Sequence, residues 1–165
     1  MQNGISIKIV IIYALKAILW VTLVTSLLLN IFTYVMPIVK YYGNSMSPAL
    51  TDGQICTVLK TENVQDGDII AFYYNNSIIV RRVIATEGKR ISIDISGAVT
   101  VDGETIEEPY VSKKTMGQSN ITFPYSVPNN SFFVMGDNRE VSMDSRLQEI
   151  GSIPKDRVIG KVILY

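Results

Sequence analysis

A long uncharged stretch, residues 17–38, restricts what the N-terminal part of the protein can become. It reads AILWVTLVTSLLLNIFTYVMPI, and about 20 apolar residues in a helix span the ~30 Å hydrocarbon core of a bilayer. A cleavable secretory leader usually has an apolar core of only about 7–15 residues that ends at a small-x-small site. This run is longer and is followed by VKYY. We therefore predict a retained transmembrane helix over residues 17–38, a short flank over residues 1–16, and the lipid bilayer as a partner.

The lysines beside this run predict its orientation. Lys8 and Lys16 precede it, whereas Lys40 follows it. Basic residues are enriched on the cytoplasmic side of a membrane span. We therefore predict a single-pass protein of the plasma membrane whose folded part, residues 41–165, lies outside the cytoplasm.

Composition excludes several classes of function. The 165 residues suffice for one domain with a core, and the 15 basic and 15 acidic side chains balance, so we predict no nucleic-acid partner. Histidine is absent and Cys56 is the single cysteine, which removes histidine-based triads, internal disulfides and most transition-metal sites. The acidic residues are scattered and the glycines form no phosphate loop, so we predict no metal and no organic cofactor. The sequence predicts no particular oligomeric state.

Beyond residue 41 the apolar run gives way to short β-branched segments separated by turn residues, a pattern typical of an all-β domain. Turn pairs such as Asp66-Gly67 and Asn75-Asn76 favour hairpins over parallel crossovers. We therefore predict a mainly β fold, an antiparallel barrel-type domain, with residues 104–130 as an excursion over its surface. The predicted strands are residues 54–59, 68–74, 78–85, 90–95, 98–101, 131–135 and 157–164.

Two polar segments are candidates for chemistry. Ser45 lies in GNSMSP (residues 43–48), close enough to the predicted span to put a hydroxyl near the membrane surface. Composition alone equally describes a linker of small residues. The second segment, residues 135–146, reads MGDNREVSMDSR, in which Asp and Arg two positions apart suit an ion pair that supports a turn. A solvated charged loop is the alternative for this segment.

Taken in order along the chain, these segments resemble the bacterial type I signal peptidases, particularly the short single-span forms of Gram-positive bacteria. GNSMSPALTDGQ resembles the family's nucleophile box, GDIIAF the strand after it, and VRRVIATEG the strand that carries the catalytic lysine. VDGETIEEPYV and VPNNSFFVMGDNREVSMDSR resemble the later hairpin and the last signature box. The resemblance implies a signal-peptidase-like fold and removal of N-terminal signal peptides from secretory precursors. Those precursors would bind as extended chains with small residues at positions −1 and −3.

The resemblance also implies a Ser/Lys dyad, in which a neutral lysine takes the proton of the attacking serine. Ser45 matches the nucleophile, and its backbone N–H would contribute to the oxyanion hole. Gly43 occupies the position where some members carry an additional serine donor. Ser142 matches the hydroxyl that orients the base, and Asp144 and Arg146 match a structural ion pair beneath the site.

The family's lysine base is replaced in this sequence. Arg81 stands at its position, next to Arg82, which matches an ordinary neighbouring arginine. A general base must spend time unprotonated, and arginine, with a pKa of about 12.5–13.8, is effectively always protonated in proteins.

Three interpretations stay open. Another amine, Lys60 or Lys89, replaces the base; or Arg81 acts only as an electrostatic partner and cleavage is slow; or the protein binds secreted or pilus-type precursors as an assembly or chaperone factor without cutting them. A structure can discriminate among them by the contact between Ser45 and Arg81, since a working dyad needs roughly 2.6–3.2 Å, or somewhat more in an unliganded state.

Overall fold

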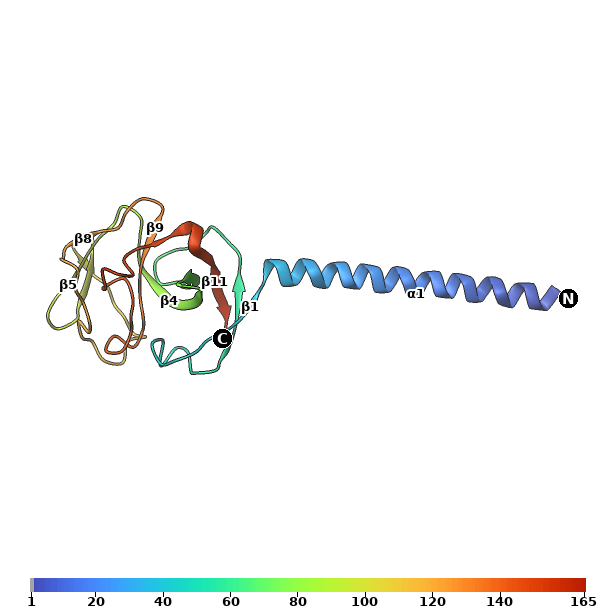
Figure 1. Ribbon diagram of the computed structural model, residues 1–165, viewed down its shortest axis with the longest axis horizontal. Helices are drawn as coiled ribbons and strands as arrows, with labels where there is room; N and C mark the ends of the chain where they lie inside the picture. Colours follow the sequence, from blue (N-terminus) through green and yellow to red (C-terminus); the bar gives the residue numbers. More distant parts are fainter. Residues whose placement is uncertain (1) are drawn as a thin grey trace. The chain divides into compact units, whose positions relative to one another are not determined.

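The computed structural model describes residues 2–165, without the side chains of residues 2–6 and 8. The chain divides after Pro37 into two compact units, and the first of them is helix α1 (Gln2–Val35) (Figure 1). Ile9–Val35 is the described helical segment that is long and apolar enough to cross a membrane. The helix begins well before residue 17 because Lys16, a good helix former, does not interrupt it. It ends before Pro37, which cannot continue a helix.

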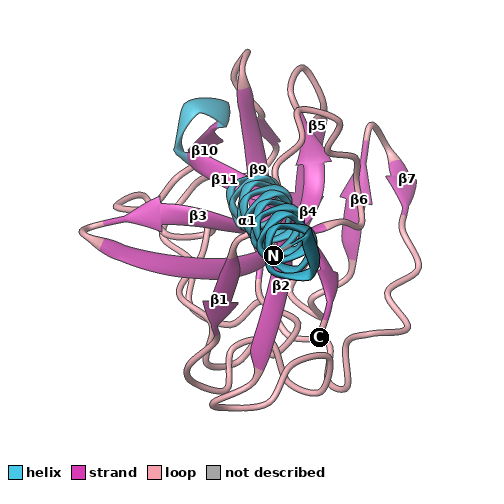
Figure 2. Ribbon diagram, turned by 90° about the vertical axis from the view of Figure 1, so that its right-hand side faces the viewer, coloured by secondary structure: helices cyan, strands magenta, loops and turns pink. Residues whose placement is uncertain are grey.

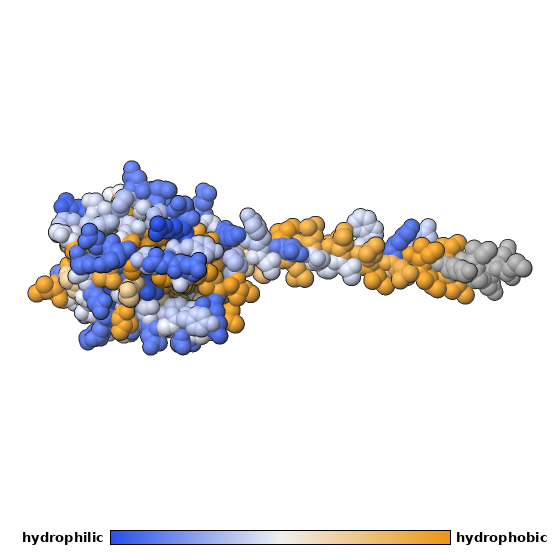
Figure 3. All heavy atoms as spheres, in the orientation of Figure 1, coloured by the Kyte–Doolittle hydropathy of each residue, from blue (hydrophilic) through white to orange (hydrophobic). Residues whose placement is uncertain are grey.

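Apolar side chains cover α1 without a polar face. All of its described side chains are exposed, and Figure 3 shows apolar residues along most of the helix on the face in view. Water disfavours such a surface, whereas hydrocarbon accepts it. The helix is therefore of the kind that a bilayer buries.

The second unit, Ile38–Tyr165, is built from antiparallel strands, as predicted. Every strand pair in it is antiparallel. The elements in chain order are β1 (Ile38–Lys40), β2 (Ile55–Leu59), β3 (Ile69–Tyr74), β4 (Ser77–Thr86), β5 (Arg90–Ile93), β6 (Val99–Val101), β7 (Glu104–Thr105), β8 (Tyr125–Ser126), β9 (Ser131–Met135), β10 (Ile153–Pro154), the short 3-10 helix η1 (Lys155–Arg157) and β11 (Val158–Leu164).

The strands form two sheets. The larger has the order β1-β2-β11-β3-β4-β9-β10, and the smaller has the order β7-β6-β5-β8. Figure 2 shows β5, β6 and β7 side by side at one edge of the domain, away from β3 and β10. The segment predicted as an excursion, residues 104–130, contains β7 and β8 and packs partly buried side chains such as Met116 and Phe123 against the smaller sheet.

Two features of this fold position the functional segments. The turn after β1 inserts Met46 and Leu50, both fully buried, into a core cluster with residues of β2 and β3. On the neighbouring strands, β4 pairs with β9 so that Arg82 lies opposite Met135. The strand that carries Arg81 therefore runs beside the start of the segment MGDNREVSMDSR.

Candidate active site

Ser45 lies in a turn whose backbone is fixed from both sides. Just before it, the N–H of Tyr41 donates to the Gln54 carbonyl at 2.8 Å, and the Gly53 N–H donates to the Tyr41 carbonyl at 3.0 Å. The Gly43 N–H donates to a carboxylate oxygen of Asp52 at 2.7 Å. Gly43 has φ +95°, a left-handed conformation that side chains other than glycine rarely adopt. The turn thus holds its half-buried serine in a defined place.

The hydroxyl of Ser45 has one side-chain partner in the described structure, the phenol of Tyr41. The two oxygens are 3.3 Å apart, and either can be the donor. The same phenol oxygen accepts a hydrogen bond from the Met46 N–H at 2.9 Å. Tyr41 therefore contacts both the nucleophile candidate and the backbone that follows it.

The carbonyl side of Ser45 is tied to the segment after β9. The Asn138 N–H donates to the Ser45 carbonyl at 3.0 Å, and the Asn138 side chain donates to the Asn44 carbonyl at 3.3 Å. Gly136 permits this approach, because a Cβ at this position would lie 2.2 Å from the Ser142 hydroxyl oxygen and 2.5 Å from the Ser45 carbonyl oxygen. The structure therefore brings Ser45 and Ser142, far apart in the sequence, to the same point.

Asp144 and Arg146 form a fully buried, bidentate ion pair, with Nε–Oδ1 and Nη2–Oδ2 distances of 2.8 Å. Asp144 also accepts the Gly136 N–H at 2.9 Å, and Arg146 donates to the Met116 carbonyl at 2.6 Å. A buried pair is stable only when its remaining donors and acceptors are satisfied in this way. The pair links the backbone at Gly136 with the segment around Met116.

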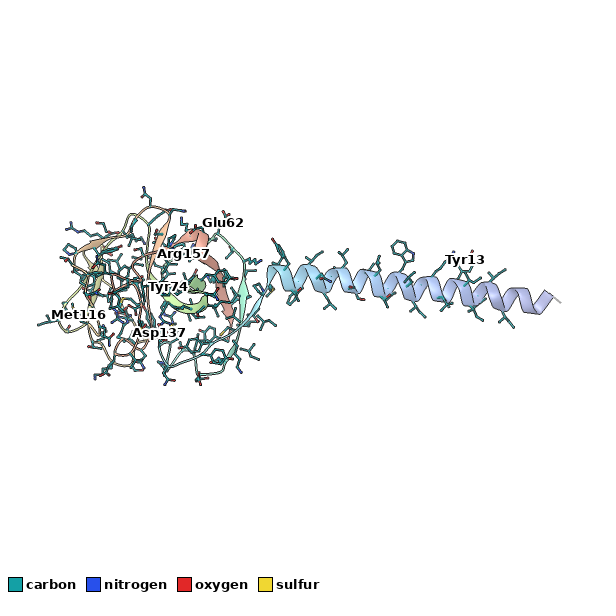
Figure 4. The ribbon with its side chains drawn as sticks, in the orientation of Figure 1. Tyr13, Glu62, Tyr74, Met116, Asp137 and Arg157 are labelled. Carbon is teal, nitrogen blue, oxygen red and sulfur yellow. The ribbon has the colours of Figure 1, made fainter. Side chains whose placement is uncertain are left out.

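A second ion pair joins β4 to the same segment. Arg82 donates to both carboxylate oxygens of Asp137, at 2.8 and 2.6 Å, and its guanidinium lies 4.0 Å from the ring centre of Tyr110. Although burial alone would lower the pKa of Arg82, the hydrogen bond and charge of Asp137 raise it. Figure 4 labels Asp137 among the side chains of the domain. The sequence did not predict this pair.

A third pair, also missed from the sequence, joins Arg139 to Glu108, and both side chains are fully buried. The partners come from the last signature segment and from the excursion over residues 104–130. Their separation in the chain exceeds what local spacing can reveal. The acidic residues of EEPY are the sequence signal that could have indicated the pair, because a charge in an apolar environment needs a partner of opposite sign.

Arg81 is 7% exposed, and its guanidinium is held by carbonyl oxygens. Its Nε and Nη2 donate to the Met143 carbonyl at 3.2 and 2.9 Å, and its Nη1 donates to the Val80 carbonyl at 2.7 Å. Burial lowers the pKa of Arg81, while the negative charges of Asp144 and of an ionised Tyr41 act in the opposite direction. Among the described residues, no hydrogen bond joins Arg81 to Ser45.

The Ser142 hydroxyl is the one buried side-chain oxygen or nitrogen that lacks a hydrogen-bond partner in the described part of the chain. An unsatisfied buried hydroxyl costs about 1–3 kcal/mol. Its neighbour in the chain, Met143, supplies the carbonyl to which Arg81 donates. The guanidinium thus bonds to the backbone beside Ser142 and leaves the hydroxyl unpartnered.

The fold places neither alternative lysine near the turn of Ser45. Lys89 follows the far end of β4, beyond Thr86, and forms an ion pair with Asp66. Lys60 is exposed and follows β2, whereas the opposite end of that strand, at Gln54, bonds to Tyr41. At ~3.3 Å per strand residue, that is about 20 Å away. The described residues also contain no group of three or more Cys, Asp or Glu side chains that could hold a metal ion.

Comparison with known proteins places this arrangement in a family. Residues 12–165 match the profile described as signal peptidase, peptidase S26. The chain belongs to the signal peptidase family. Signal peptidase I T of Bacillus subtilis is 35% identical over 131 residues, which cover 72% of this chain and 67% of that protein. Signal peptidase IB of Staphylococcus aureus is 32% identical over 140 residues, covering 73% and 72%.

A solved structure shows the same fold. The crystal structure of a signal peptidase I from Enterococcus faecalis superimposes with a TM-score of 0.54 and 25% identity, covering 63% of this chain and 100% of that one. The predicted fold class and the assignment to signal peptidase I are therefore confirmed. Family membership supports a hydrolase activity of the serine peptidase kind, and the apolar N-terminal helix fits a membrane-anchored protein. The relatives give no support to the alternative of a precursor-binding factor that does not cut.

Proposed function

We propose that this chain is a membrane-anchored type I signal peptidase in which Ser45 is the nucleophile. The observation that carries the proposal is the convergence of the Ser45 backbone carbonyl, Gly136 and the Ser142 hydroxyl in one place, in a turn that holds the Ser45 hydroxyl half-buried. A rigidly held hydroxyl is what attack on a peptide carbonyl requires. The family membership and the apolar helix support the same function.

In the first half of the reaction, Ser45 Oγ attacks the scissile carbonyl carbon and forms an acyl-enzyme that water later hydrolyses. The Ser45 N–H stabilises the negative charge on the carbonyl oxygen. Gly43 supplies no hydroxyl to this oxyanion hole, and a serine at φ +95° would be strained. The oxyanion is therefore stabilised without a serine side chain at position 43.

Ser142, Asp144 and Arg146 support the site without touching the substrate. The buried ion pair holds the Gly136 N–H through Asp144, and Gly136 in turn sets the spacing between Ser142 and the Ser45 carbonyl. These contacts hold the turn of Ser45 and the segment after β9 in fixed positions relative to each other.

Arg81 occupies the position of the family's lysine base and acts as an electrostatic partner, not as the base. All of its hydrogen bonds go to carbonyl oxygens, which only accept hydrogen bonds, so the guanidinium is held as a donor. Bringing an arginine pKa from ~13 to ~8 would require roughly 7 kcal/mol at ~1.36 kcal/mol per unit. Burial lowers the pKa of Arg81, but Asp144 opposes the shift. Arg81 therefore contributes a fixed positive charge to the site and does not accept the proton of Ser45.

The substrates are secretory precursors that bind as extended strands with small side chains at positions −1 and −3. Residues 17–38 lie in the plasma membrane, residues 1–16 form the N-terminal flank on the cytoplasmic side, and residues 41–165 form the extracytoplasmic catalytic domain. The basic residues before the helix support this orientation.

Cleavage of a precursor by the full-length protein in detergent tests the proposal. With a precursor that carries an Ala-x-Ala site, we expect mature product from the natural protein and a loss of at least about 10³-fold in Ser45→Ala, as expected for removal of a nucleophile. Ser47→Ala is the matched control, because this serine lies in the same turn and is also half-buried. Equal cleavage by Ser45→Ala would contradict the assignment of the nucleophile.

A further inference from the structure

The phenol of Tyr41 lies against the hydroxyl that attacks the substrate, and the inference that follows rests on the proposed function of Ser45. Its oxygen is 3.3 Å from Ser45 Oγ, which is a reacting atom. Tyr41 is 3% exposed and packs in the core cluster of Met46 and Leu50. Hydrogen bonds on both its backbone N–H and its carbonyl fix the backbone at Tyr41, and the core packing holds the ring.

The phenol oxygen is also fixed by hydrogen bonds with the turn. The Met46 N–H donates to its oxygen at 2.9 Å, and the Ser45 hydroxyl can donate to it as well. Both contacts hold the phenol oxygen beside the reacting atom of Ser45.

The choice of base follows from comparing the two candidates at Ser45. Tyrosine side chains ordinarily lose their proton near pH ~10, and arginine side chains near 12.5–13.8. At the same pH the unprotonated form of a tyrosine is therefore more abundant by a factor on the order of 10² or more. The phenol oxygen also faces Ser45 directly, whereas the nitrogens of Arg81 face carbonyl oxygens.

We propose that Tyr41 is the general base of this peptidase, because its phenol oxygen faces Ser45 Oγ whereas the guanidinium of Arg81 faces carbonyl oxygens. The proton of Ser45 Oγ passes to the Tyr41 oxygen as Oγ bonds to the carbonyl carbon of the substrate. The protonated Tyr41 then gives this proton to the amine nitrogen as the peptide C–N bond breaks. In deacylation Tyr41 takes a proton from the attacking water and returns it to Ser45 Oγ as the acyl bond breaks, which restores the starting state.

Other ionisable groups near Tyr41 bear on the pH dependence. Arg81 approaches from β4, and Asp144 and Arg146 act on Arg81 from the segment after β9. Cys56 of β2 belongs to the same core cluster, and burial raises the pKa of its thiol. Because a thiol also titrates at alkaline pH, each profile is recorded in a Cys56→Ala background as well.

The test compares Tyr41→Phe with Tyr42→Phe in the full-length protein, by kcat/KM on the Ala-x-Ala precursor. Tyr42 is the adjacent tyrosine, 69% exposed and stacked near Lys40. We expect Tyr41→Phe to lose about 10²–10⁴-fold, the usual contribution of a general base, and Tyr42→Phe to retain activity. Thermal unfolding of both variants shows whether the domain is intact.

A second variant separates catalysis from positioning. Replacement of Tyr41 by 3,5-difluorotyrosine keeps the ring and hydroxyl but makes the phenol more acidic. A general base works unprotonated, so activity of the natural protein should rise with pH, and the fluorinated variant should shift this rise to lower pH. A residue that only positions Ser45 would leave the rise where it was.

The outcomes distinguish this inference from the proposed function. If cleavage depends on Ser45 but fluorination leaves the pH profile unchanged, the role of Tyr41 as base is overturned and the peptidase assignment stands. If no Ser45-dependent cleavage occurs at any pH, both are overturned. A shifted profile together with the loss in Tyr41→Phe establishes the Ser45–Tyr41 pair.

Discussion

At the scale of single residues, the proposed site combines a buried supporting ion pair with an arginine where the resemblance implies a lysine base. Asp144 and Arg146 form their buried ion pair, and Ser142 reaches the Gly136 backbone. The guanidinium of Arg81, however, bonds to the Met143 carbonyl and leaves the Ser142 hydroxyl without a partner. An amine with three rotatable donors could satisfy that hydroxyl, whereas the planar guanidinium does not.

Arg81→Lys should therefore install a second base. The burial that lowers the pKa of Arg81 would lower the pKa of a lysine there too, and Ser142 would gain a partner. A lysine base is active when neutral, so activity should rise as pH increases through the lowered lysine pKa. We expect the rise in kcat/KM to move to lower pH, activity near neutral pH to increase by about 10²-fold, and Tyr41→Phe to cost much less in this background.

Arg90→Lys on β5 is the control for this change, because it makes the same replacement at an exposed position. The pH profile of Arg90→Lys should match that of the natural protein. An Arg81→Lys variant with an unchanged profile and an undiminished dependence on Tyr41 would mean that the lysine does not reach Ser45.

The residues of this site differ in how far the sequence could predict them. Ser45, Ser142, Asp144 and Arg146 lie in dense polar motifs, so their resemblance to a family pattern was visible. Tyr41 was not predicted, since beside Tyr42 it looked like one more aromatic residue near a membrane boundary. Its role depends on the turn that folds residue 41 back onto residue 45, and residue spacing does not reveal the path of an irregular turn.

At the scale of elements, long segments were predictable and short ones were not. All seven predicted strands are present within a residue or two at each end, because alternation over several residues and flanking turn pairs define them. The strands β1, β7, β8 and β10 have only two or three residues each, too few for a periodic pattern. Their pairing is set by neighbouring strands and not by their own composition. The three-residue strand β6 was predictable because the turn pairs Ser96-Gly97 and Asp102-Gly103 flank it.

Gly136, at the end of β9, is the point where the elements of the site come closest. Gly136→Ala would put a Cβ 2.2 Å from the Ser142 hydroxyl oxygen and 2.5 Å from the Ser45 carbonyl, so one of the two segments must move. Overpacking of this kind costs typically about 1–3 kcal/mol. We expect lower thermal stability, measured by circular dichroism in detergent, together with a loss of precursor cleavage of about 10²-fold, because a displacement of ~1 Å misaligns the nucleophile.

Gly103→Ala separates the loss of thermal stability from the loss of precursor cleavage. Gly103 lies in a turn with φ +88°, and an added Cβ there meets nothing within 4 Å. This variant should lose stability through backbone strain and yet cleave normally. If Gly136→Ala cleaved the precursor as fast as Gly103→Ala does, the close approach of Ser142 and Ser45 would not be needed for the reaction.

At the scale of the whole molecule, one apolar helix and one β domain imply two environments. The side chains of Ile9–Val35 are exposed all round, which only a bilayer makes favourable, while the domain has its own buried clusters. The sequence predicted the span from its length. It could not predict the helical ends, because a lysine such as Lys16 is compatible both with a helix and with a membrane boundary.

The orientation of the two environments is open to a direct measurement. In a Cys56→Ala background, Ser112→Cys puts a single thiol at an exposed position of the domain, and Gln2→Cys puts one before the apolar segment. With the domain outside, a membrane-impermeant maleimide added to intact cells should label Ser112→Cys and leave Gln2→Cys unlabelled until the membrane is permeabilised. The reverse pattern would put Ser45 on the cytoplasmic side, where it could not meet translocated precursors. It would also mean that the lysine excess before the helix does not retain the N-terminus in the cytoplasm.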